Sequence, residues 1–169
     1  MTIADKIIFI ICAALLFAAS VIDYKKRIIP PIFPTLLFVC GIFLAVFNIA
    51  VYKNFAFDEI LHCLLGAVSG GLFLIIAALI GKIFFAKETI GGGDIKLMAG
   101  IGSVIGWDKA IFANIAAFFI ASVVGIILIL AKKLDRRGYM PFAPFLSAGV
   151  YISIILPQTY INYFSKIML

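Results

Sequence analysis

The sequence predicts an all-α, polytopic membrane protein: a six-helix transmembrane bundle with both termini outside and a functional site at the cytoplasmic membrane face. Of its 169 residues, 65% are hydrophobic and 13% are charged, and the mean hydropathy is +1.24. A soluble domain is roughly 45–50% apolar and 25% charged, so a soluble fold could not cover this much apolar surface. Charged residues, proline and glycine divide the chain into six apolar runs, which set the predicted number of helices.

The six runs are taken in chain order as helices covering residues 3–22, 32–52, 60–85, 95–107, 110–131 and 142–160. About 20 residues are needed to span the hydrocarbon core, so five runs are long enough and the fourth is short. The short run follows Gly91, Gly92 and Gly93, which predicts irregular backbone at membrane depth; such backbone is tolerated only inside protein or beside a water-filled cavity. Residues 1–169 are therefore expected to form a single membrane domain.

Basic residues set the predicted topology, because cytoplasmic loops are enriched in Lys and Arg. The linkers after the first, third and fifth runs are the basic ones, with Lys25, Lys26, Arg27, Lys87, Lys132, Lys133, Arg136 and Arg137. The opposite side mixes Lys6, Lys53, Lys109 and Lys166 with Asp5, Asp58, Glu59 and Asp108. This arrangement places both termini outside, and it accounts for the net charge of +6 without a nucleic-acid partner.

Two carboxylates stand out, Asp23 at the end of the first run and Asp94 at the start of the fourth. An ionisable group in a spanning helix costs at least ~2.5 kcal/mol at the bilayer centre and by default marks a functional site. Alone, Asp23 could form an interfacial ion-pair cluster with the basic residues that follow it. Because both aspartates are predicted at the same depth on the same side, acid/base chemistry is favoured.

No cofactor or metal is expected. Cys12, Cys40 and Cys63 lie in separate apolar runs and are interpreted as small hydrophobic residues. His62 adjoins Cys63, but neighbouring helical positions point apart, so a packed or interfacial histidine is the preferred interpretation. The glycine run lacks the Gly-Lys-Ser/Thr ending of a phosphate-binding loop.

The sequence Gly91-Gly92-Gly93-Asp94 resembles the G-x-G-D motif of membrane aspartic proteases, and specifically that of type IV prepilin peptidases. The stretch from Asp23 to the Ile29-Pro30 pair resembles the surroundings of that family's first aspartate. A third match, Met140-Pro141-Phe142-Ala143-Pro144, resembles its proline-rich entry to the last helix. One departure is Pro31, where the family more often has a polar residue.

The resemblance implies an aspartic endopeptidase of the cell's inner (cytoplasmic) membrane that removes the basic leader of type IV prepilin or pseudopilin precursors, in pilus assembly or protein secretion. Its catalytic residues would be Asp23 and Asp94. Longer members carry two C-x-x-C pairs ahead of the first aspartate and also methylate the new N-terminus. This sequence has no such insert, so peptidase activity without methyltransferase activity is expected.

Two carboxyl groups close together tend to share one proton. Asp94 opens a helix, where the macrodipole favours an anion, and Asp23 ends one, where an anion is disfavoured. We therefore hypothesise Asp94 as the ionised base and Asp23 as the acid. Gly91 and Gly93 would let a substrate strand approach the backbone, and Lys96 would contact lipid headgroups, neutralise the aspartates or orient a substrate carboxylate.

Two rival functions use the same features. A small proton-coupled transporter or channel would also have intramembrane carboxylates and a broken helix, although no symmetry-related interruption is visible in the other half of the chain. A protease that cuts within spanning helices shares the G-x-G-D pattern, but that class usually has Tyr before its first aspartate, whereas Ile22 precedes Asp23.

Overall fold

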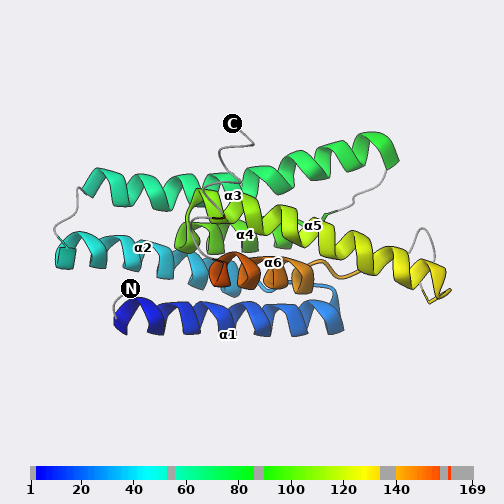
Figure 1. Ribbon diagram of the computed structural model, residues 1–169, viewed down its shortest axis with the longest axis horizontal. Helices are drawn as coiled ribbons and strands as arrows, with labels where there is room; N and C mark the ends of the chain where they lie inside the picture. The colour runs from blue at the N-terminus through cyan, green and yellow to red at the C-terminus, as the bar shows by residue number, and fades with distance from the viewer. Residues whose placement is uncertain (1–2, 53–55, 86–89, 134–139, 157–159, 161–169) are drawn as a thin grey trace.

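The computed structural model describes residues 3–52, 56–85, 90–133, 140–156 and 160, and the regular structure of these residues is helical (Figure 1). The six helices are α1 (Ile3–Lys26), α2 (Ile32–Tyr52), α3 (Ala56–Phe85), α4 (Gly92–Ile105), α5 (Trp107–Leu130) and α6 (Ala143–Ile155). The predicted six-helix bundle is therefore confirmed.

Four helices, α1, α2, α3 and α5, are long and apolar enough to cross a membrane. Five were expected, because the sixth run was predicted to extend to residue 160. Instead, α6 has 13 residues and ends at Ile155, and Leu156 is extended, with φ −66° and ψ 137°. The next residue in the sequence is Pro157, and a proline disfavours helical backbone in the residue before it. Residues 157–159 lie outside the described part of the chain.

Two helix boundaries differ from the expectation in a way that matters for the aspartates. The first helix continues to Lys26, so Asp23 lies on its last turn rather than after it. The fourth helix begins at Gly92, so Gly92 and Gly93 belong to its first turn, and Gly91 is the N-cap with φ −72° and ψ 142°. The glycine run therefore starts a regular helix instead of forming an irregular loop.

The short helix α4 lies at the centre of the bundle, packed against α2 and α3 with further contacts to α5 and α6. Nine of its 14 residues are buried. Glycines allow this close packing: a Cβ on Gly66 of α3 would collide with the Gly102 carbonyl, and a Cβ on Gly70 would lie 2.7 Å from the Met98 carbonyl oxygen. Small residues at helix crossings let backbones approach closely in membranes.

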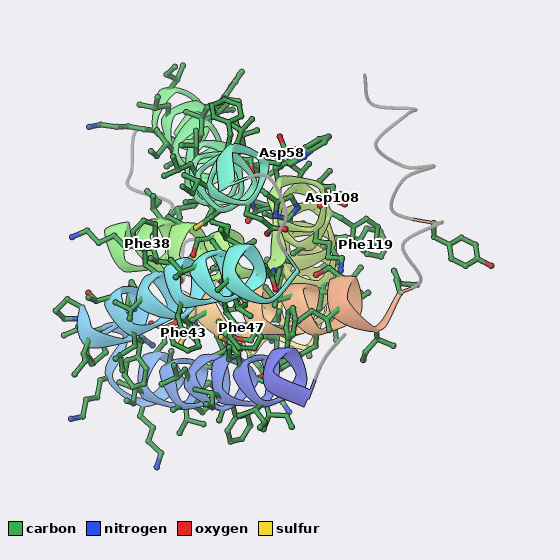
Figure 2. The ribbon with its side chains drawn as sticks, turned by 90° about the vertical axis from the view of Figure 1, so that its left-hand side faces the viewer. Phe38, Phe43, Phe47, Asp58, Asp108 and Phe119 are labelled. Atoms are coloured by element: carbon green, nitrogen blue, oxygen red, sulfur yellow. The ribbon has the colours of Figure 1, made fainter. Side chains whose placement is uncertain are left out.

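The bundle is apolar on its sides and charged at its ends. The long helices expose many large apolar side chains, such as Ile10, Phe43 and Val68, as expected for surfaces in contact with lipid. Asp58 and Asp108 open α3 and α5 and lie at the end that faces the viewer in Figure 2. Lys25 and Lys26 occupy the last turn of α1, and α1 runs antiparallel to α2, so the basic cluster lies at the opposite end.

Candidate active site

Asp23 lies where the end of α1 meets the start of α6. Its side chain is 3% exposed, and its Oδ2 atom accepts a hydrogen bond from the backbone N–H of Ala143 at 3.2 Å. Ala143 is the first residue of α6, and the residue at the N-cap, Phe142, makes no side-chain cap. Asp23 therefore caps a helix that begins 120 residues later in the chain.

Asp94 lies in the first turn of α4 and is also 3% exposed. Its backbone N–H donates to the Gly91 carbonyl at 3.0 Å. By contrast, its Oδ1 atom is buried without a hydrogen-bond partner among the described residues. Burying a polar group without a partner is costly, so this oxygen is available for a ligand or a water.

The two aspartates lie close enough for the charge of Asp23 to act on the Asp94 carboxyl group. The pKa of Asp94 is raised, mainly by burial of the carboxyl group and secondly by the charge of Asp23. Asp94 lies on α4, which is outside the four membrane-spanning helices. Close carboxyl groups cannot easily both ionise and tend to share one proton. The predicted pair is thus formed by the last turn of α1 and the first turn of α4, and α6 supplies a hydrogen bond to Asp23.

A model of the type IV leader peptidase family matches residues 10–130, which include both aspartates. The chain belongs to this family.

The type IV leader peptidase relatives include prepilin leader peptidase/N-methyltransferases of three bacteria. The Bacillus subtilis protein is 35% identical over 106 residues, covering 63% of this chain and 41% of the relative. The Burkholderia pseudomallei protein is 30% identical over 141 residues (83% and 43%), and the Pseudomonas aeruginosa protein is 25% identical over 152 residues (88% and 50%). The chain thus spans half or less of the length of these relatives. No solved structure matches the chain significantly.

The connection between α1 and α2 runs from the end of the helix that carries Asp23 past the start of the helix that carries Asp94. Arg27, the first residue after α1, has φ 55°, and its N–H donates to the Asp23 carbonyl at 2.8 Å. Ile29 then packs on the start of α4: a Cβ on Gly93 would lie 3.0 Å from the Ile29 Cβ. Gly93 therefore accommodates Ile29, whereas the sequence suggested that it faces a substrate. Among the residues that the structure describes, no atom lies within 4 Å of a Cβ position on Gly92.

A buried hydroxyl network, which the sequence analysis missed, holds α1 against α6 one turn from Asp23. The Ser20 and Ser147 hydroxyl oxygens are 2.6 Å apart, and the Ser20 hydroxyl also donates to the Leu16 carbonyl at 2.8 Å. Farther from the site, the Tyr151 hydroxyl donates to the Ala13 carbonyl at 2.8 Å. The sequence contained one indication that Ser20 lies near the site: it is three positions before Asp23, so the two residues share a helix face.

The remaining candidates lie away from the aspartate pair. Lys96 is exposed, and two positions along a helix differ by about 200°, so it points away from the buried Asp94. This geometry favours lipid contact over neutralisation of the pair.

His62 packs against Gly106, which has φ 86°. Among the described residues, His, Cys, Asp and Glu form no group of three that could hold a metal.

The three cysteines are free thiols, of which Cys12 and Cys63 are buried. Cys12 on α1 interacts with Cys40 on α2, although the two lie in separate runs of the sequence. Helix packing has brought together two positions that spacing alone did not pair.

Proposed function

We propose that this chain is an aspartic endopeptidase of the cytoplasmic membrane that removes the basic leader from type IV prepilin or pseudopilin precursors. The observation that carries the proposal is the aspartate pair: two buried carboxyl groups from distant parts of the chain, one hydrogen-bonded to a helix start and the other with an oxygen that has no partner among the described residues. Family membership and the activity for which the relatives are named support the substrate class. The transporter alternative has no comparable support.

The proposed topology has both termini outside and the aspartate pair on the cytoplasmic side. Exposed Lys25, Lys26 and Lys96 lie near the pair, while Asp58 lies at the other end of the bundle. Basic residues favour the cytoplasmic side of a membrane and its anionic lipids. A precursor whose leader has not been exported would present its cleavage site on this same side.

The geometry leads us to propose roles opposite to those expected from the sequence. The dipole at the start of α6 and the Ala143 N–H both stabilise a negative charge on Asp23. Asp94 is more readily protonated, because burial and the neighbouring charge favour its neutral form. Asp23 is therefore assigned as the base and Asp94 as the acid.

In this mechanism, Asp23 takes a proton from a water molecule as the water oxygen adds to the scissile carbonyl carbon. Asp94 donates its proton to the carbonyl oxygen, which gives a neutral tetrahedral diol. Collapse of the diol breaks the C–N bond: the proton held by Asp23 moves to the leaving nitrogen, and a diol hydroxyl returns a proton to Asp94. General acid–base catalysis of this kind contributes about 10²–10⁴-fold per group.

The test is cleavage, in liposomes, of a precursor with a basic leader and an apolar segment, followed by mass spectrometry. Wild type should release the leader, and Asp23→Asn and Asp94→Asn should each lose cleavage by at least about 10²-fold. Asp58→Asn is the matched control, because it removes a carboxylate at the opposite end of the bundle. Cleavage that persists in either aspartate variant would contradict the proposal.

A further inference from the structure

A large apolar cavity lies between α3 and α5, on the side of the bundle where the aspartate pair lies. Its volume is about 700 Å³. Of the described residues that line it, all but Ser122 are apolar or glycine, and they include small residues on both helices: Ala77 and Gly81 of α3, and Ala121 of α5. The walls of this cavity thus offer few side-chain hydrogen-bonding groups, and a ligand would bind there through its apolar surface.

The same cavity is joined to the supports of both aspartates. Phe142, at one wall, directly precedes Ala143, which donates to Asp23. Ile90, at another wall, directly precedes Gly91, the N-cap of the helix that carries Asp94. A chain that leaves the aspartate pair past these two residues would enter the cavity.

Three aromatic rings connect the cavity to the start of α6. Phe73 of α3 and Phe118 of α5 have ring centroids 6.0 Å apart, and Phe118 and Phe142 have centroids 5.1 Å apart. All three side chains line the cavity. Edge-tilted rings at these distances attract one another and fix their relative positions. The cavity wall and the Asp23 support therefore form one packed unit.

The helices that flank the cavity extend well past the aspartate pair. On α3, Gly71 lies beside Ile95 in the first turns of α4, and α3 continues to Phe85, about 20 Å farther at 1.5 Å per residue. Figure 1 shows α3 and α5 projecting beyond α1 and α6 at this end. The projecting parts expose large apolar side chains, including Phe84 (78%) and Leu130 (77%). The pair is thus recessed between two apolar helix ends.

We propose that this cavity receives the apolar helix of the precursor, in the residues directly after the scissile bond. Small residues one turn apart occur on both flanking helices, Ala77 and Gly81 on α3 and Ala121 and Gly125 on α5, a pattern that lets a further helix approach closely in a membrane. The basic leader, by contrast, is excluded from apolar walls because burying charge is costly. The inference rests on the proposed peptidase function and adds the site that selects its substrate.

The test compares two substrates in liposomes: a full precursor, and a short peptide that carries the leader and cleavage site without the apolar helix. Ala77→Phe places a ring in the cavity and should lower cleavage of the full precursor at least 10-fold, while cleavage of the short peptide stays within about twofold of wild type. Ala78→Phe is the matched control, because it makes the same change at the next residue, which is outside the cavity lining and equally half-buried. Equal effects on both substrates, or no effect on either, would overturn the inference.

A second measurement does not depend on catalysis. The photoreactive residue benzoylphenylalanine is placed at Ser122, at the exposed rim of the cavity, in the Asp94→Asn background. The control site is Ile127, which is also exposed and lies about 140° around the helix. We expect position 122 to crosslink to the apolar segment of the precursor, and we expect position 127 not to do so.

Crosslinks from position 122 to lipid or to a second copy of the chain, without the precursor, would overturn the inference. If wild type cleaves neither substrate, the proposed peptidase function fails. The crosslinking result still decides whether the cavity binds the apolar helix, so the two failures are distinguishable.

Discussion

Asp23 and Asp94 are the same residue type and have the same exposure, 3%, but their surroundings differ. Asp23 ends its own helix and accepts a hydrogen bond from the first N–H of another. Asp94 starts its own helix and has an oxygen without a partner among the described residues. The ionisation of a buried carboxyl group thus depends on which helix start it faces and on the donors it finds there, as well as on its burial.

The strongest test of this comparison is to remove both carboxylates. If they act as one unit that shares a proton, the Asp23→Asn/Asp94→Asn double variant should cleave no more slowly than either single variant, each of which loses about 10²–10⁴-fold. Single-turnover cleavage rates in liposomes measure this. Losses that multiply in the double variant would mean that the two residues act independently.

The next test addresses how the start of α4 is positioned. Gly93→Val forces the new side chain against Ile29 and should displace Asp94 from Asp23, and a shift of about 1 Å can cost about 10²-fold in rate. Gly92→Val is the matched control: a Cβ there has no neighbour within 4 Å in the described part of the chain, so helix position should be kept. Protein level in the membrane is measured beside cleavage. Equal activity of the two variants would show that Gly93 has no positioning role.

A smaller effect is expected in the pH dependence of stability. Because burial and Asp23 raise the pKa of Asp94, the folded state binds this proton more tightly than the unfolded state. The contribution to stability is therefore full below the ordinary aspartate pKa of about 3.9 and is lost as pH rises through the folded value. Asp94→Asn cannot lose that proton, so its melting temperature in detergent should fall less between pH 4 and pH 8. Parallel curves for wild type and Asp94→Asn would contradict this assignment.

The smallest expected effect concerns the Ser20–Ser147 contact that holds α1 beside α6. Ser20→Ala, Ser147→Ala and the double variant form a double-mutant cycle, and hydrogen bonds between membrane helices average about 0.6 kcal/mol in such cycles. Unfolding free energies in detergent measure the coupling. A coupling near zero would indicate that helix packing alone positions Asp23.

The apolar runs predicted most of the fold because a membrane imposes a length and a composition on each spanning helix. The sixth helix was predicted too long, since hydropathy continues past Ile155 while the backbone turns at Leu156. The Asp23–Ala143 hydrogen bond could not be predicted from spacing, because it joins residues 120 positions apart. For the same reason, the sequence placed Asp23 at the end of α1, as the structure has it, but did not show that the side chain also faces the start of α6.

The sequence by itself determined the helical class, the six segments and the two aspartates, because each depends on local composition or on a short motif. Tertiary structure decided which glycine accommodates Ile29, which helix start Asp23 caps, and which helices form the apolar cavity that reaches Phe142 and Ile90. These features depend on the relative depth and rotation of neighbouring helices. Depth and rotation are fixed by interhelical packing, which has no signature within any single segment.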